Sequence, residues 1–348
     1  MWQAKTWKSS VIFILLFILL LAALIVGVSI GAVAIRPSEV IRILLSHIPG
    51  LDRLLTASWL PEHDIIITTI RFPRVILAAL VGAGLALAGA TFQGLFRNPM
   101  ADPYVIGVSS GAALGAVVSI LLQSVFHITV GYAIPIFAFV FALLTILLVY
   151  DLARVGSKVP VMTLLLAGIA VNSVLSALVS LCMFLAGNQL NQVVFWLLGG
   201  FSGRGWDYVY MFIPYGLAGT AVIFLYAREL NAMLLGEESA QHLGVEVERV
   251  KIRLLVAAAV LTGACVSVSG LIGFVGLVIP HVVRILLGPD HRTLLPAVAL
   301  IGAIFVLLAD VVSRVIIVPG ELPVGIVTAL VGGPFFIYLL KGQKNSMF

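Results

Sequence analysis

The residues of this chain that could perform chemistry form none of the common catalytic patterns. The sequence lacks a G-x-x-x-x-G-K-[ST] phosphate loop, a dinucleotide-binding glycine pattern and an H-E-x-x-H zinc pattern. It also offers no nucleophile and base in an arrangement typical of covalent catalysis. The sequence therefore predicts no catalytic residue, no metal site and no cofactor, and a protein that is not an enzyme.

One pair of ionisable residues lies within a long apolar run. Asp310 is the one acidic residue well inside a predicted membrane span, and Arg314 follows four positions later on the same helix face. Ionisable groups at such depth are costly and often functional. An intrahelical ion pair that helps both residues tolerate the site is an equally good interpretation. A proton-coupled carrier normally needs a relay of such groups, which this sequence does not offer.

A polar stripe stands in another apolar run. Asn172, Ser176 and Ser180 recur every four residues, so they share one face of a helix. They are candidates for lining a transport pathway. Contacts between neighbouring helices are the alternative, because small polar residues also serve that purpose in membranes.

The amino-acid composition indicates that the chain is embedded in a membrane. Of 348 residues, 61% are hydrophobic and only 10% are charged, against roughly 25% charged in soluble domains. The formal net charge of +5 is carried by residues between apolar runs, which suits anionic lipid head groups and not nucleic acid. The sequence predicts an all-α, multi-pass protein of the cytoplasmic membrane, folded as a single domain over residues 1–348.

A helix that crosses a bilayer needs about 20 apolar residues, and on this basis hydropathy predicts ten membrane spans. They cover 11–34, 75–96, 104–126, 131–150, 160–186, 209–227, 251–270, 273–287, 294–318 and 324–340. Basic residues flank both termini, so both are predicted to be cytoplasmic, which requires an even number of spans. Residues 35–70 are then an outer-face segment, and residues 228–253 form the longest polar stretch on the inner face.

Several segments together resemble the FecCD family of permeases, the membrane subunits of ATP-driven importers for ferric siderophores, haem and cobalamin. The resemblance covers roughly residues 70–340. It rests on RFPR (71–74), FRNPMADPYVIGVSSGAALG (96–115), LLLAG (164–168), LGEESAQHLGV (235–245), GFVGLVIPHVVR (273–284), DHRTLLP (290–296), ADVVSR (309–314) and ELPVGIVTALVGGP (321–334). It implies the type II ABC importer permease fold, in which ten spans per subunit is the usual number.

The resemblance also implies partners and roles. A second permease subunit, identical or similar, would complete the pathway. Cytoplasmic ATP-binding subunits would supply the energy, and an extracytoplasmic solute-binding protein would deliver the substrate. In relatives, arginines equivalent to Arg71, Arg74 and Arg314 meet acidic residues of that binding protein. The predicted topology places all three at the outer side.

Two further regions take roles from the resemblance. The coupling loop that fits the ATPase corresponds to Leu235, Gly236, Glu237, Glu238, Ser239, Ala240, Leu243 and Gly244, with the two glycines as turns that bracket a short helix. The cytoplasmic gate corresponds to two turns, containing Asn98 and Met100, and Val161 and Met162. Some relatives carry small hydroxyl residues at the second turn, so a more apolar gate is expected here.

The sequence therefore predicts the transmembrane permease subunit of an ATP-binding-cassette importer, with a ferric siderophore as the favoured substrate. The same machine carrying cobalamin or haem is the alternative. An ion-coupled secondary carrier is the alternative of a different class.

Overall fold

The fold is a bundle of helices that matches the predicted spans. The computed structural model describes the chain except residues 1, 51–58, 129, 157, 318–319 and 345–348. The ten helices that match the spans are α1 (Trp2–Ser29), α4 (Phe72–Phe96), α5 (Val108–Val125), α6 (Ala133–Ala153), α7 (Val161–Leu185), α9 (Trp206–Leu225), α12 (Val247–Ser269), α13 (Val275–Leu287), α14 (His291–Val315) and α15 (Val324–Lys344). In the described residues, eight helices are long and apolar enough to cross a bilayer, and α13 and the apolar part of α15 are shorter. The prediction of an all-helical, multi-pass membrane protein is confirmed.

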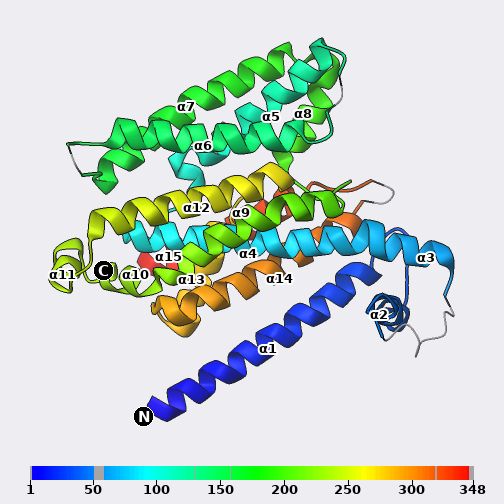
Figure 1. Cartoon of the computed structure of the whole chain (residues 1–348), viewed down its shortest axis with the longest axis horizontal. Coiled ribbons are helices and arrows are strands. Elements are labelled where there is room, and N and C mark those ends of the chain that lie inside the picture. Colours follow the sequence, from blue (N-terminus) through cyan, green and yellow to red (C-terminus); the bar gives the residue numbers. More distant parts are fainter. Residues whose placement is uncertain (1, 51–58, 129, 157, 318–319, 345–348) are drawn as a thin grey trace.

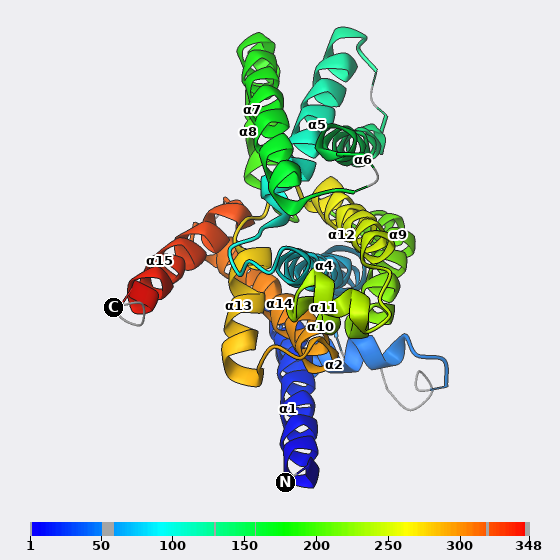
Figure 2. The same ribbon diagram turned by 90° about the vertical axis from the view of Figure 1, so that its left-hand side faces the viewer.

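Helix α4 forms the centre of the bundle, with α9, α12, α13 and α14 around it (Figure 2). Its sequence is rich in Gly and Ala, which allows neighbouring backbones to approach closely. A Cβ atom at Gly89 would overlap the backbone of Gly276 in α13, and one at Gly82 would overlap the backbone of Gly302 in α14. These glycines therefore set how closely α13 and α14 pack against α4.

A second group of helices lies on the far side of α12 (Figures 1 and 2). It consists of α5, α6, α7 and the short α8 (Leu190–Leu198), and it joins the central group mainly through contacts of α12 with α5 and α6. Helices α1 and α7 are peripheral: within the most apolar 18-residue stretch of each helix, only 17% and 22% of the residues are buried against the rest of the chain. The two groups can thus move as separate bodies only if the contacts with α12 change.

The long apolar stretch 254–287 is broken as the sequence predicts. Helix α12 ends at Ser269 and α13 begins at Val275. Gly270 and Phe274 both have positive φ, at 70° and 67°, so the chain turns sharply between the helices. A side chain from elsewhere satisfies this irregular backbone: the Tyr104 hydroxyl donates to the carbonyl of Ile272 at 2.8 Å and accepts from its N–H at 2.9 Å.

The predicted outer-face segment 35–70 is only partly a separate segment. Helix α2 (Pro37–Ser46) lies within it, but α3 (Pro61–Ile65) and η2 (Ile66–Arg71) continue into α4 as one helix of 36 residues. Such a helix is about 54 Å long, much longer than the roughly 30 Å of a bilayer core. Because the residues at its start are polar, hydropathy alone does not assign these extra turns to the helix.

Both chain ends lie at one end of the bundle. Helix α1 begins and α15 ends at the same end of the long axis as α10 (Ala227–Leu234) and α11 (Glu237–His242) (Figure 1). This agrees with an even number of spans. Following the predicted orientation, we call this the inner end and the opposite one, which carries α2, the outer end.

Candidate functional site

The outer end buries the three predicted docking arginines, and two of them, Arg74 and Arg314, pair with the buried carboxylate of Asp310. Arg71, Arg74 and Arg314 are only 6%, 8% and 8% exposed. Arg74 donates from Nε and Nη2 to the carboxylate of Asp310 at 2.8–3.2 Å, and from Nη1 to Glu321 at 2.9 and 3.0 Å. Arg314 makes a second ion pair with Asp310 at 3.2 Å. The expected pair four residues apart is present, and Arg74 adds a partner that sequence reasoning missed.

The other guanidinium contacts tie α1 to the centre of the bundle. Arg71 donates to the carbonyls of Val28 and Val33 at 3.0 and 2.6 Å. Arg314 donates to the carbonyls of Gly27 and Ile30 at 2.9 and 2.8 Å. These carbonyls lie at or just beyond the C-terminus of α1, where cations are favourable. The two arginines thus stabilise the packing of α1 against α4 and α14.

This arrangement bears on the predicted docking role. All three guanidinium groups already have partners within the chain, so none of them projects as a free charge. Contact with an acidic partner protein would require them to exchange these partners. The docking role remains a prediction, and the geometry adds a scaffolding role for the same residues.

Glu321 is the most accessible member of this cluster. Its side chain is 36% exposed, in the connection between α14 and α15. Burial by itself raises the pKa of Glu321, but the hydrogen bonds and the charge of Arg74 outweigh it and hold the pKa below its usual range. Glu321 therefore stays ionised at neutral pH.

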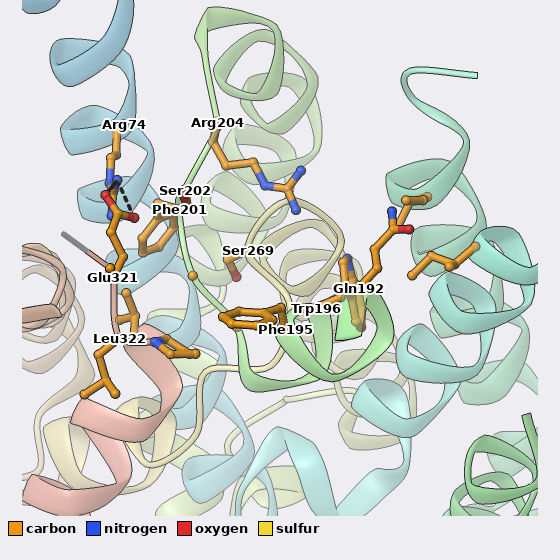
Figure 3. A pocket seen from close by; sticks show the side chains of 17 residues that line it. Arg74, Gln192, Phe195, Trp196, Phe201, Ser202, Arg204, Ser269, Glu321 and Leu322 are labelled. Atoms are coloured by element: carbon orange, nitrogen blue, oxygen red, sulfur yellow. Dashed lines mark hydrogen bonds and ion pairs between the residues drawn. The ribbon is translucent and has the colours of Figure 1, made fainter. Parts of the chain in front are cut away.

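A cavity of about 510 Å³ opens beside this cluster (Figure 3). Arg74 and Glu321 lie on one side of it and Arg204 on another, around an apolar wall that includes Phe195 and Phe201. The guanidinium of Arg204 lies 4.3 Å from the ring centre of Tyr208. A mostly apolar cavity with a few polar groups is typical of ligand sites.

At the inner end, the predicted coupling loop folds as expected. Helix α11 lies between Gly236 and Gly244, whose φ angles are 112° and 84°. Ala240 faces inward and is fully buried, whereas Leu235 and Leu243 are 68% and 65% exposed. Exposed leucines on a polar segment favour a surface that another protein covers.

The coupling loop is fastened to α14 through Asn231 in α10. The Asn231 amide donates to Asp290 at 2.7 Å, and its carbonyl oxygen accepts from the backbone N–H of His291 at 2.8 Å. Asp290 caps α14 by accepting from the backbone N–H of Arg292 at 3.0 Å. Burial by itself raises the pKa of Asp290, but these hydrogen bonds and the nearby positive charge lower it overall.

The two predicted gate turns meet at the inner end. Asn98 follows α4, and its side-chain oxygen accepts from the N–H of Met100 at 2.9 Å. Met162, at the start of α7, is 69% exposed. Val161, in the second turn, and Phe96, two residues before Asn98 of the first, line the same small cavity. The assignment of these turns as a gate remains a prediction, and their proximity supports it.

The predicted pathway residues lie on α7. Val171 and Val179 form part of its buried face, while Ser176 and Ser180 are exposed and Asn172 is half-buried. In the described part of the chain, the Ser180 hydroxyl donates to the carbonyl of Ser176 in its own helix, at 3.0 Å. The serines are thus exposed in this chain, and lining of a pathway remains a prediction for them, with contacts to a neighbouring helix as the alternative.

The described residues hold no metal-binding cluster. Within those residues, no three His, Cys, Asp or Glu side chains gather closely enough to coordinate an ion.

Comparison with known proteins gives consistent matches over nearly the whole chain. The family model described as the FecCD transport family matches residues 18–342. The cobalamin import system permease protein BtuC of Halobacterium salinarum is 49% identical over 281 residues, covering 81% of this chain and 74% of that protein. The Fe(3+)-citrate import system permease protein YfmE of Bacillus subtilis is 40% identical over 333 residues, covering 96% and 95%. A solved structure, described as an inward-facing conformation of a putative metal-chelate type ABC transporter, superposes with a TM-score of 0.81 at 32% identity, covering 95% of this chain and 99% of that one.

Proposed function

The chain belongs to the FecCD transport family, as a permease of the ATP-binding-cassette importer type, and from this premise we propose that it moves an iron chelate across the cytoplasmic membrane. A ferric siderophore is the favoured substrate. Cobalamin and haem are the alternatives within the same machine. Membership of this family sets aside the alternative of an ion-coupled secondary carrier.

The coupling loop is the observation that carries the proposed mechanism. Exposed Leu235 and Leu243 flank helix α11 at the inner end, which also carries the two turns proposed as the gate. We expect a separate ATP-binding subunit to cover these leucines. Binding and hydrolysis of ATP in that subunit would then move the loop and open the gate. Both termini would lie on this cytoplasmic side.

The opposite end supports docking of a solute-binding protein. The arginine cluster and the cavity beside it lie at the outer end, where a delivered substrate would enter. Charges at such a rim mainly orient an arriving partner. A second permease subunit would complete the pathway along the exposed face of α7.

The attachment of the ATP-binding subunit can be tested with L243D. Leu243 is 65% exposed, so a carboxylate there should not disturb the permease fold. We expect the variant to insert normally and to lose co-purification with the ATP-binding subunit. The matched control is L60D, since Leu60 is 59% exposed at the outer end. Equal binding by L243D and wild type would contradict the proposed coupling surface.

The substrate can be tested in proteoliposomes that contain the permease, its ATP-binding subunits and its binding protein. The proposal expects ATP-dependent uptake of iron supplied as a ferric siderophore. Uptake of labelled cobalamin or haem without uptake of the ferric siderophore would overturn the substrate assignment and leave the importer mechanism intact.

A further inference from the structure

A buried lysine connects the coupling loop to the rest of the inner end. Lys251 lies in the second turn of α12 and is 8% exposed. A lysine is rarely buried to this degree without ionic partners. Its Nζ lies 3.0 Å from both carboxylate oxygens of Glu237 and 2.9 Å from Glu248. Two carboxylates therefore hold one ammonium group at the junction of α11 and α12.

These contacts continue to the proposed gate. Glu237 is the first residue of α11, and Glu248 belongs to α12. The other oxygen of Glu248 accepts the backbone N–H of Val159 at 3.3 Å, in the turn that leads into α7. A continuous series of polar contacts thus runs from α11 through Lys251 and Glu248 to the residues just before Val161.

The apolar part of Lys251 reaches the same place. It lines the small inner cavity together with Phe96 at the end of α4 and Val161 at the start of α7. Val159, which also lines this cavity, is only 6% exposed. Lysine side chains commonly pack their methylene groups on apolar surface in this way. Lys251 therefore shares this cavity with the helix ends that lie at both predicted gate turns.

Within the described part of the chain, the pair Glu237–Lys251 is the one ion pair made by α11. The central helices and the group α5–α7 are joined mainly through α12, on which Lys251 lies. A displacement of α11 by a bound subunit would be transmitted at this point to both helix groups.

We propose that Lys251 is the positioning residue that links the coupling helix α11 to the gate turn at 159–162. This inference rests on the proposed function. Displacement of α11 pulls Glu237, which carries Lys251 and Glu248 with it and shifts the Val159 backbone. The gate then follows the ATP-binding subunit. Without the ammonium group, α11 still binds that subunit, but its movement no longer reaches the gate.

The test compares K251M, K251R, E237Q and E248Q in the complete transporter with ATP-binding subunits and binding protein. The readout is substrate transported per ATP hydrolysed, which loss of folded protein alone does not change. We expect a fall of about tenfold or more for K251M, a smaller fall for E237Q and E248Q, and recovery with K251R. The matched control is R249M, because Arg249 is a neighbouring cation with a 70% exposed side chain, and its ratio should stay at the wild-type value.

A spectroscopic measurement follows the gate directly. Spin labels at M162C and R228C report the distance between the gate turn and α10, on which Arg228 is exposed. Trapping the nucleotide-bound state should change this distance with Lys251 present and leave it unchanged in K251M.

The outcomes separate the two proposals. If K251M assembles and keeps the wild-type ratio and distance change, the link through Lys251 is wrong. If K251M does not assemble, E237Q and E248Q decide, and wild-type ratios in both would overturn the link. If the unaltered complex shows no ATP-driven uptake, the proposed function itself fails.

Discussion

The most informative single substitution is D310N at the outer end. Asp310 is fully buried and is the shared partner of Arg74 and Arg314. The change keeps the shape of the side chain and removes its negative charge. Two buried guanidinium groups then lose the carboxylate between them, while Arg74 keeps Glu321 and Arg314 keeps backbone carbonyls.

The magnitude follows from these contacts. Removing one member of a buried ion pair costs about 3–5 kcal/mol. Because the amide still accepts a hydrogen bond and both arginines retain other partners, we expect a value of about 3 kcal/mol. In a thermal unfolding measurement in detergent, an unfolding entropy of about 2.1 cal/mol/K per residue over a chain of 348 residues converts this loss into a fall in the midpoint of roughly 4 °C.

The assay needs a matched control at the same cluster. E321Q removes the other carboxylate bound to Arg74, but that side chain is 36% exposed, and exposed pairs contribute only about 0–1 kcal/mol. D310N should therefore lower the midpoint several degrees more than E321Q. Equal shifts for the two variants would refute the idea that Asp310 is the centre of the outer scaffold.

Three further predictions concern packing, pH and the broken helix. G89A places a methyl group into the backbone of α13 and should reduce the yield of folded protein severely. At Gly131, no atom of the residues that the structure describes lies within 4 Å of an added carbon, so G131A should match wild type in size-exclusion recovery. Folding lowers the pKa of Glu321 from its ordinary value of 4.5. Its contribution to stability is therefore complete above pH 4.5 and is lost as the pH falls through the folded-state pKa. Below pH 4.5 the unfolding midpoint of wild type should fall more steeply than that of E321Q, and parallel curves for the two proteins would contradict this. Y104F removes the hydroxyl that bonds both backbone groups of Ile272, so it should destabilise the protein by about 1–3 kcal/mol, and an unchanged unfolding midpoint would contradict it.

The sequence was sufficient for properties that depend on local hydropathy and chain geometry. Composition and apolar run length predict a membrane bundle and its ten helices, because the bilayer acts on each span separately. The break between α12 and α13 and the turns at Gly236 and Gly244 are also local, since glycine marks backbone that other residues seldom adopt. The polar start of the helix at Pro61 was missed because it extends beyond the apolar run.

Tertiary structure alone decided which distant residues meet. The sequence places Arg314 one helical turn from Asp310. It gives no sign that Arg74, which is 236 residues from Asp310 in the chain, is the closer partner of that carboxylate. Likewise, no motif in the sequence singles out Lys251, although through Glu237 and Glu248 it joins α11 to the turn before α7. Both contacts depend on how helices cross around α4, and that crossing is set by close backbone approach and not by any local pattern. Periodicity and run length therefore determined what kind of protein this is, and helix packing determined which charged residues meet at each end of the bundle.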